Sequence, residues 1–197
     1  MRVIAGTYRS RQLVAPRGAA TRPTSDRLRE TLFNILSPRL NQCRLADLYA
    51  GTGAVGIEAL SRSAAHVWFA EKSAPALAAI RTNLKALKIG QNFTIEERGA
   101  AALLERFSNS AQTPAETALS TPALDIVYLD PPWEAEAEYT TTLHLLGSSR
   151  GRPILAPGEL VIAEHSSKTP LAARFGDLIQ TRTLKQGDAA LTFYAIS

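Results

Sequence analysis

The stretch Asp47-Leu-Tyr-Ala-Gly-Thr-Gly-Ala-Val-Gly56 decides how the rest of this chain folds. An apolar run that begins at Leu45 leads into it, and a helical pattern that begins at Ile57 follows it. A strand, a glycine turn and a helix start bring bare backbone N–H groups against a ligand. Glycine permits positive φ and removes the Cβ that would block close approach. The stretch therefore predicts a pocket for a nucleotide-like cofactor.

Strand and helix patterns alternate from this stretch to the end of the chain. Apolar runs predict strands, and amphipathic or alanine-rich segments between them predict helices. The order predicts an α/β, Rossmann-like fold with a mostly parallel seven-stranded sheet, helices on both faces and a C-terminal antiparallel strand pair. The expected elements are strands at 45–50, 66–71, 93–97, 124–129, 159–165, 178–185 and 190–196, helices at about 54–63, 74–88, 100–107 and 135–147, an N-terminal hairpin at 3–14, and a polar surface insertion at 108–122. A further helix is expected before Pro38, capped by Thr24, Ser25 or Asp26 and with Leu28, Leu32, Ile35 and Leu36 at helical spacing.

Charge separates the first 44 residues from the rest. Residues 1–44 hold nine arginines against Asp26 and Glu30, a net charge of +7, whereas residues 45–197 hold 13 basic and 16 acidic residues, a net charge of −3. We therefore divide the chain into a basic N-terminal hairpin and helix module at 1–44 and a larger domain at 45–197. A basic end on a slightly acidic body is typical of nucleic-acid readers, and a merely solvated basic face is the alternative.

Composition excludes several classes of protein. The chain has 197 residues, enough for one domain with a small addition. No apolar run approaches the roughly 18 residues of a membrane span, and the N-terminus lacks the apolar core of a signal peptide. The single cysteine, Cys43, forms no internal disulfide, and the three histidines show no metal-ligand spacing. We expect a cytoplasmic, metal-free and monomeric protein that has no contact with a membrane.

Two cofactors suit the glycine pattern. Gly51-x-Gly53-x-x-Gly56, with Glu71 18 residues beyond Gly53, fits both a nicotinamide cofactor and S-adenosylmethionine. Three features favour S-adenosylmethionine. Asp47 lies at the strand end, where its carboxylate can face a cationic ligand. Asp-Pro-Pro-Trp at 130–133 follows the fourth expected parallel strand, at the edge where such sheets hold substrates. The basic module indicates a polyanionic substrate, which is unusual for a small-molecule dehydrogenase.

Several segments together resemble a known family. They are Met1-Arg-Val-Ile-Ala-Gly6, Arg22-Pro-Thr-Ser-Asp-Arg-Leu-Arg-Glu-Thr-Leu-Phe-Asn-Ile-Leu36, Asp47-Leu-Tyr-Ala-Gly-Thr-Gly53, Gly56-Ile-Glu-Ala-Leu-Ser-Arg62, Glu71 and Tyr128-Leu-Asp-Pro-Pro-Trp133. The chain resembles class I S-adenosylmethionine-dependent methyltransferases of exocyclic amines. More narrowly, it resembles the bacterial RsmD family, which methylates guanine N2 in 16S ribosomal RNA. The resemblance runs nearly end to end, and its most specific part is Arg-Pro-Thr-x-Asp-Arg at 22–27. The Asp-Pro-Pro-aromatic motif is shared with DNA adenine methyltransferases and does not identify the base.

The resemblance implies a role for each of three groups of residues. The catalytic loop consists of Asp130, Pro131, Pro132 and Trp133. The S-adenosylmethionine site consists of Asp47, Tyr49, Gly51, Thr52, Gly53, Glu71, Lys72, Gly99 and Ala100. The RNA-binding residues are Arg9, Arg11, Arg22, Thr24 and Arg27. The chain departs from the family in two places: Glu-Arg-Gly-Ala at 97–100 stands where an acidic or amide residue usually holds the adenine amine, and Trp133 stands where Tyr or Phe is commoner.

The motif residues suit methyl transfer to an exocyclic amine. The amine of guanine is a poor nucleophile because its lone pair is delocalised into the ring. Asp130 and the Pro131 carbonyl are the expected acceptors of its two N–H bonds, and Trp133 offers a face on which the extruded base stacks. The implied substrate is 16S rRNA or the small ribosomal subunit. The alternatives are transfer to DNA adenine N6 or a protein glutamine amide, and a non-catalytic RNA-binding assembly factor.

Overall fold

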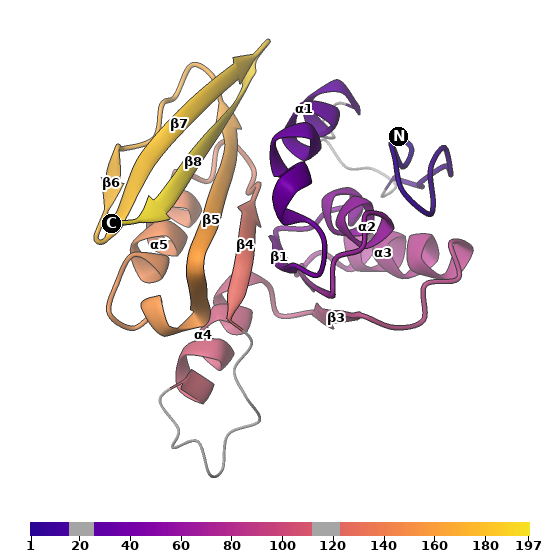
Figure 1. The fold of residues 1–197 in the computed structure, drawn as a ribbon, viewed down its shortest axis with the longest axis horizontal. Coiled ribbons are helices and arrows are strands. Elements are labelled where there is room, and N and C mark those ends of the chain that lie inside the picture. The colour runs from indigo at the N-terminus through magenta and orange to yellow at the C-terminus, as the bar shows by residue number, and fades with distance from the viewer. Residues whose placement is uncertain (16–25, 112–122) are drawn as a thin grey trace. The chain divides into compact units, whose positions relative to one another are not determined.

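The computed structural model of the chain describes residues 1–15, 26–111 and 123–197. These residues form two compact units, 1–97 and 98–197, which are drawn in Figure 1 from indigo to magenta and from pink to yellow. Each unit is described by itself. The expected RNA-binding residues Arg22 and Thr24, and residues 112–122 of the expected insertion, lie outside the described residues.

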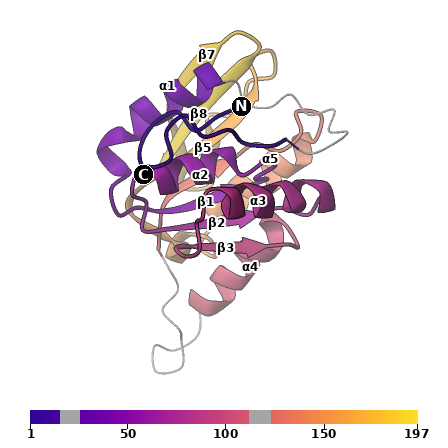
Figure 2. The same cartoon turned by 90° about the vertical axis from the view of Figure 1, so that its right-hand side faces the viewer.

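The first unit is built on three parallel strands. The strand order is β3-β2-β1, and the register pairs Asp47 of β1 with Phe69 of β2. The elements are α1 (Asp26–Leu36), a 3₁₀ turn (Ser37–Arg39), β1 (Arg44–Leu48), α2 (Ala54–Ser61), β2 (His66–Ala70), α3 (Ala74–Ala86) and β3 (Phe93–Glu96). Helices α2 and α3 lie against one face of these strands (Figure 2). All of β1 after Arg44 is buried, as expected for a central strand of a covered sheet.

The N-terminal segment is less regular than the expected hairpin at 3–14. A single antiparallel bridge joins Arg2 to Gln12, and turns occupy most of the residues between them. The backbone N–H groups of Ile4 and Ala5 donate to the Glu58 carboxylate of α2, at 2.7 and 2.9 Å, instead of pairing across a hairpin. Glu58 is fully buried, so its charge needs partners within the protein. These two N–H donors and the Arg62 guanidinium, at 2.8 Å, provide them. The segment is therefore held to α2 by the Glu58 side chain and by Ser61, whose carbonyl oxygen accepts the N–H of Thr7 at 2.8 Å.

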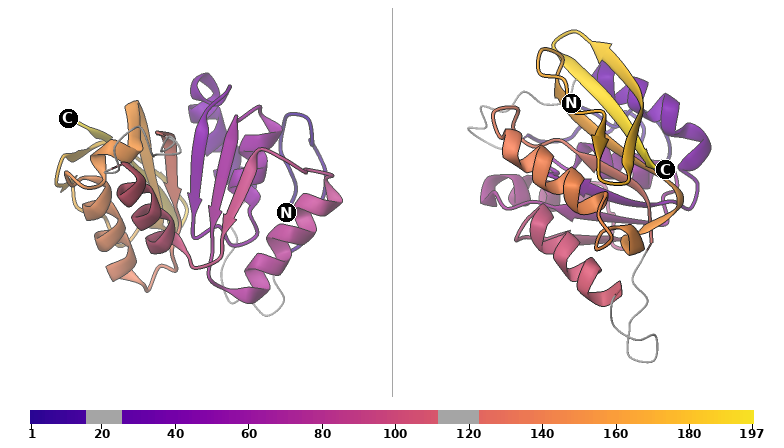
Figure 3. Two further views of the ribbon diagram at one scale, coloured as in Figure 1. Left: turned by 90° about the horizontal axis from the view of Figure 1, so that it is seen from below. Right: turned by 90° about the vertical axis from the view of Figure 1, so that its left-hand side faces the viewer.

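The second unit combines a parallel strand pair with an antiparallel extension. Its strand order is β4-β5-β8-β7-β6; β4 and β5 are parallel, and β8 runs antiparallel to both β5 and β7. The elements are α4 (Ala100–Ala111), β4 (Leu124–Leu129), α5 (Glu136–Leu146), a 3₁₀ turn (Arg152–Ile154), β5 (Leu155–Ser166), β6 (Arg174–Phe175), β7 (Leu178–Gln186) and β8 (Ala189–Ile196). Helices α4 and α5 lie on the same side of β4 and β5 (Figure 3). The predicted α/β class, with mostly parallel strands and an antiparallel C-terminal pair, is confirmed.

Three details of the predicted elements are wrong. The described residues contain eight strands, because the two-residue β6 pairs with β7 at its start. Strand β5 begins at Leu155 because Pro157-Gly158, which reads as a turn, forms an irregularity between the pairs Leu124–Leu155 and Ile126–Leu160. Helix α4 continues through 108–111, the expected start of the insertion.

Other predictions about the core are confirmed. Helix α1 buries Leu28, Leu32 and Leu36 of the expected stripe, whereas Ile35 is half-buried and Phe33, which was not predicted, is buried. Cys43 and Trp68 are both buried in the core. Over the described parts of the chain, no helix is both long and apolar enough to cross a membrane.

Candidate functional site

The glycine loop after β1 has the backbone conformation that the sequence predicts. Gly51 and Gly53 have φ of 55° and 74°, and Tyr49 has φ of 63°, which is unusual for a bulky residue. A Cβ placed at Gly51 meets no described atom within 4 Å, whereas a Cβ at Gly56 would lie 2.2 Å from Cε1 of Phe69. Gly51 therefore leaves open space beside the backbone, while Gly56 lets α2 pack closely on β2.

Asp47 is an internal brace of this loop. Its side chain is 1% exposed, and its Oδ2 accepts the N–H of Gly56 at 2.9 Å. Burial raises the pKa of the carboxyl from 3.8 to about 8, although the Gly56 bond opposes the rise and nearby Glu71 adds to it. Asp47 therefore fixes the start of α2. Because its pKa is near neutral pH, a nearby charge can shift the carboxyl between its protonated and ionised forms.

Glu71 joins the glycine loop to the start of α3. One carboxylate oxygen, Oε2, accepts the N–H of Gly51 at 2.9 Å. The other, Oε1, accepts the N–H groups of Lys72 and Ser73, each at 2.8 Å. A carboxylate has about four acceptor positions, and Glu71 remains partly exposed, so it retains acceptor capacity toward a ligand. The structure brings Asp47, Gly51 and Glu71 together within the first unit.

The residues after β3 show a division that the sequence did not indicate. Glu96 is buried, whereas Glu97 is exposed and forms an ion pair with Arg81. Gly99 has φ of 87°, and Ala100 begins α4 as a buried residue of the second unit. Glu97, the residue that the sequence analysis singled out, is therefore paired with Arg81 on the surface. Its neighbour Glu96 is the more buried carboxylate.

The Asp-Pro-Pro-Trp loop follows β4 in the second unit. Asp130 is partly exposed and Trp133 is partly exposed, while Pro131 between them is buried. The carbonyl oxygen of Pro131 accepts the hydroxyl of Tyr139 at 3.0 Å, and that of Pro132 accepts the N–H of Ala135 at 2.8 Å. The loop therefore has two fixed carbonyls beside a carboxylate that solvent can reach.

A buried polar network supports this loop from below. The hydroxyl of Tyr139 also lies 2.9 Å from the backbone oxygen of Glu164, and Tyr128 donates its hydroxyl to the Glu164 side chain. All three residues are at most 4% exposed. Sequence reasoning missed Tyr139 and Glu164, because a helix residue eight positions beyond Pro131 gives no local signal of a contact with it.

The expected RNA-binding residues of the N-terminal segment are partly accounted for. Arg9, Arg11 and Arg27 are exposed, and a guanidinium nitrogen of Arg11 lies 3.4 Å from the Ala86 carbonyl oxygen. Arg29, however, is fully buried and donates to the Arg2 carbonyl and to Asp26. The basic surface is therefore smaller than the count of arginines suggests, because one of them serves the core.

Two of the three histidines, His66 and His165, occupy structural positions. His66 lies in β2 against Thr94, at 3.0 Å, and burial lowers its pKa. His165 is buried, and burial lowers its pKa as well. In the ranges 1–15, 26–111 and 123–197, no three His, Cys, Asp or Glu residues are grouped so that they could hold a metal ion.

Comparison with known proteins gives matches along the whole chain. The model of a family described as "Conserved hypothetical protein 95" matches residues 1–195. A Bacillus subtilis protein named "Putative rRNA methyltransferase YlbH" is 32% identical over 194 residues, 98% of each chain. The Haemophilus influenzae protein "Ribosomal RNA small subunit methyltransferase D" is 35% identical over 134 residues, which are 68% of this chain and 64% of that protein.

A solved structure agrees with these matches. The structure titled "Putative methyltransferase yhhF from Escherichia coli" is 30% identical and superposes with a TM-score of 0.78 over 100% of this chain and 98% of the other. On these matches, the chain belongs to the family described as conserved hypothetical protein 95, the RsmD family of methyltransferases.

Proposed function

We propose that this protein transfers a methyl group from S-adenosylmethionine to the exocyclic N2 amine of a guanine in the 16S RNA of the small ribosomal subunit. The family, and the names of relatives in Bacillus subtilis and Haemophilus influenzae, support a methyltransferase that acts on ribosomal RNA. The observation that supports transfer to an exocyclic amine is the loop at 130–133, in which a carboxylate stands beside an anchored carbonyl; the choice of guanine N2 in 16S RNA rests on the resemblance to the RsmD family.

The first unit offers groups that fit S-adenosylmethionine. The open side of Gly51 admits close approach to backbone N–H groups. Glu71 has acceptor capacity for ribose hydroxyls, and buried Asp47 lies behind the loop, where a nearby positive charge favours its ionised form. We assign a role in cofactor binding to Tyr49, Thr52, Gly53, Lys72, Gly99 and Ala100 as well. The cofactor supplies an activated methyl group on a positively charged sulfur.

In the proposed reaction, the loop at 130–133 prepares the amine. Asp130 accepts one N–H bond, and the Pro131 carbonyl accepts the other, which draws the nitrogen toward tetrahedral geometry. Tyr139 occupies one lone pair of the Pro131 carbonyl and leaves the second for the amine. Pro132 stiffens the loop, and Trp133 stacks the base, a contact worth roughly 1–3 kcal/mol.

Because the methyl group is already activated, alignment provides most of the acceleration in this proposal. A carbonyl that is fixed before the substrate arrives needs no reorganisation during the reaction. The hydroxyl of Tyr139 fixes it from a side chain that is 3% exposed, where water does not compete. The amine releases its proton after transfer, to Asp130 or to water.

The exposed arginines of the N-terminal segment provide the RNA contacts in this proposal. Arg9, Arg11 and Arg27 are available to phosphates, and we assign the same role to Arg22 and Thr24. The same protein acts as a cytoplasmic monomer in this proposal. DNA adenine N6 or a protein glutamine amide as acceptor, or an assembly factor without catalysis, are its alternatives.

A labelled-methyl experiment tests the proposal. The purified protein is incubated with S-adenosylmethionine carrying a tritiated methyl group and with RNA or small subunits from cells that lack it. Nucleoside digestion should yield labelled N2-methylguanosine at one position. Label in N6-methyladenine or in protein would identify another acceptor, and no transfer with no binding of S-adenosylhomocysteine would favour the assembly factor.

A matched pair of variants assigns the role of Asp130. Asp130→Asn should reduce kcat by at least about 10²-fold, because the acceptor that shapes the amine loses its charge. Asp177→Asn, an exposed change in the same unit, should leave kcat unchanged. Full activity of Asp130→Asn would show that Asp130 has no part in the mechanism. The identity of the methylated product, which the nucleoside digestion determines, would not be affected.

A further inference from the structure

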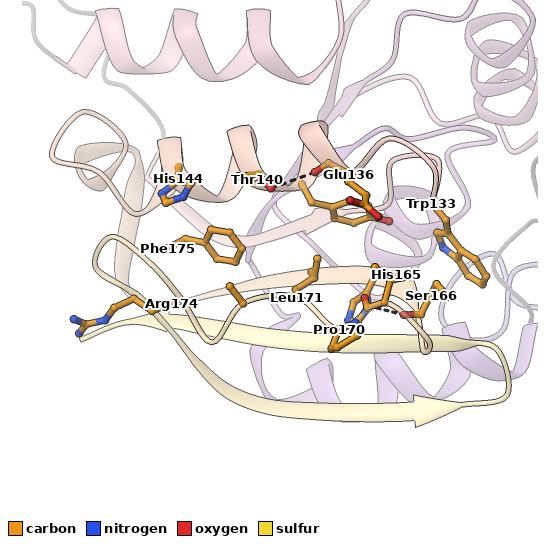
Figure 4. A pocket seen from close by; sticks show the side chains of 13 residues that line it. Trp133, Glu136, Thr140, His144, His165, Ser166, Pro170, Leu171, Arg174 and Phe175 are labelled. Carbon is orange, nitrogen blue, oxygen red and sulfur yellow. Dashed lines mark hydrogen bonds between the residues drawn. The ribbon is translucent and has the colours of Figure 1, made fainter.

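A pocket of about 330 Å³ lies within the second unit, between α5 and the segment that connects β5 to β6. Glu136, Thr140 and His144 line it from α5, where a spacing of four residues places them on one face. Figure 4 shows Trp133 at one end of the pocket and Arg174 at the other. The pocket thus begins at the last residue of the Asp-Pro-Pro-Trp loop and extends away along the helix.

The walls of this pocket are fixed by buried and partly buried hydrogen bonds. His165 has Nδ1 at 2.9 Å from the Ser166 oxygen and 3.0 Å from the Thr169 oxygen, and Nε2 at 2.8 Å from the hydroxyl of Thr192. Tyr139 forms another part of the wall and is held by the Pro131 and Glu164 carbonyls. A pocket with such walls is formed before a ligand arrives, which reduces the entropy lost on binding.

The chemistry of the lining suits one unpaired nucleobase. Trp133 and the packed rings of His144 and Phe175 provide aromatic surface, the last two with centroids 5.1 Å apart. The exposed carboxylate of Glu136 can accept base N–H groups, and Arg174 provides a positive charge for a phosphate. The volume lies at the low end of the range for ligand pockets, which is about 300–1,000 Å³. A single nucleotide fits this size, whereas a duplex does not.

We infer that this pocket binds one unstacked nucleotide that is next to the target guanine in the RNA chain. This inference rests on the proposed function. The target guanine itself is a poorer occupant, because neither Asp130 nor Pro131 lines the pocket. Trp133 belongs both to the catalytic loop and to the pocket wall, so the occupant lies beside the base that reaches Asp130. The pocket therefore selects RNA by a flanking nucleotide held outside any helix.

Two neighbouring threonines of α5 provide a matched test. Thr140 lines the pocket and Thr141 does not, and both are exposed. Thr140→Glu puts bulk and negative charge where the nucleotide lies, whereas Thr141→Glu makes the same change of net charge outside the pocket. With 16S rRNA as substrate, Thr140→Glu should raise the KM for RNA by about tenfold relative to Thr141→Glu, through loss of one base contact. The kcat and the affinity for S-adenosylhomocysteine should be equal in the two variants, and an equal KM for RNA would overturn the inference.

Tryptophan fluorescence tests the pocket independently of catalysis. The chain has two tryptophans, and Trp68→Phe leaves Trp133 as the only one. A short single-stranded RNA should quench Trp133 in this variant by stacking, and Thr140→Glu should weaken the quenching about tenfold in RNA concentration. If no methyl transfer occurs but the quenching and its loss are observed, the proposed function fails and the nucleotide pocket remains. If methyl transfer occurs and Thr140→Glu changes neither KM nor quenching, only the pocket assignment fails.

Discussion

The glycine loop of the first unit and the Asp-Pro-Pro-Trp loop of the second unit are organised in opposite ways. In the glycine loop, acidic side chains accept bonds from backbone N–H groups: Asp47 from Gly56 and Glu71 from Gly51. In the other loop, a side chain donates to the backbone, because the hydroxyl of Tyr139 bonds the carbonyl of Pro131. In the glycine loop, carboxylates hold backbone N–H donors in place. In the Asp-Pro-Pro-Trp loop, a hydroxyl donor holds a backbone carbonyl acceptor in place.

This difference suits what each loop is proposed to bind. Carboxylates that already hold backbone N–H groups give the glycine loop its shape and place negative charge near a positively charged sulfonium. An anchored carbonyl presents a fixed acceptor to an incoming amine. The first arrangement stores a cost, since a buried carboxyl is unfavourable without the ligand. In the second, the Tyr139 hydroxyl already holds the Pro131 carbonyl before the substrate arrives. Substitutions in the two loops should therefore differ in their effects on stability, pH dependence and turnover.

The largest expected effect is on the pH dependence of stability through Asp47. Well below pH 3.8 the carboxyl is protonated in both the folded and the unfolded state. Between its unfolded pKa of 3.8 and its folded pKa of about 8, only the unfolded chain releases the proton, which favours unfolding as pH rises. This contribution amounts to at most about 1.4 kcal/mol per pH unit and ends above pH 8. Denaturant unfolding of wild type and Asp47→Asn from pH 5 to 9 measures it.

The Asn variant should lack that slope and should become the more stable protein toward pH 8. Its amide oxygen can still accept the Gly56 N–H, so the loop keeps its shape. Parallel stability curves for the two proteins would show that Asp47 is ionised in the folded state at neutral pH. The same stability measurement with saturating S-adenosylhomocysteine, which lacks the sulfonium charge, gives a comparison with a neutral ligand.

The next effect separates two glycines of the same loop. Gly56→Ala should lower the free energy of unfolding by roughly 2–3 kcal/mol, because its Cβ would lie 2.2 Å from the buried ring of Phe69. Gly51→Ala should cost only about 1 kcal/mol for its φ of 55°, but it should weaken binding of S-adenosylhomocysteine. Urea unfolding and calorimetric titration measure the two quantities. Gly90→Ala, whose Cβ meets no described atom within 4 Å, is the control.

The reverse ranking would refute the assigned roles of these glycines. If Gly51→Ala unfolds the protein and Gly56→Ala weakens ligand binding alone, then Gly51 is the packing residue. The sequence pattern cannot make this distinction, because both positions belong to the same Gly-x-Gly-x-x-Gly motif.

Much of the fold was predictable from local patterns in the sequence. β4 at Leu124–Leu129 and the order of elements follow from apolar runs between turn residues, and α1 follows from its buried stripe. The start of β5 was not predictable, because Pro157-Gly158 has the same local signature in a turn as in a strand irregularity. The irregular N-terminal segment was not predictable either, since Glu58, 53 or 54 positions away in the sequence, accepts the N–H groups of Ile4 and Ala5.

In the candidate site, too, some features were predictable from the sequence and others were not. The motifs indicate Asp47, Glu71 and Asp130, because these residues stand at strand ends where ligands bind. They do not indicate that Asp47 is enclosed by protein or that Arg29 is buried, since burial depends on tertiary packing. Tyr139 is likewise invisible to a motif, because its hydroxyl matters only once α5 lies under the loop.

The third effect tests the anchored carbonyl. Tyr139→Phe should lower kcat about tenfold, because the Pro131 carbonyl loses its fixed direction, and should cost about 1 kcal/mol of stability. Tyr194→Phe is the control, because this buried tyrosine also donates to a backbone carbonyl, that of Ala172 at 2.9 Å. It should cost similar stability with kcat unchanged at saturating RNA. Equal loss of kcat in the two variants would mean that general loosening, not the Pro131 anchor, limits turnover.

The smallest effect concerns the exposed arginines, which neither loop contains. Arg9→Ala should reduce the slope of log affinity for RNA against log salt concentration by about one, the value for one lost phosphate contact. Arg150→Ala, an exposed change in the second unit with a weak 3.9 Å pair to Glu105, should leave the slope unchanged. Filter binding across a salt series measures both. A slope that falls equally in both variants would show that any surface cation contributes, so that residues 1–44 would lose their special part in RNA binding. A change confined to Arg9 would instead divide the labour: the N-terminal segment holds the RNA backbone, and the loop at 130–133 selects the base.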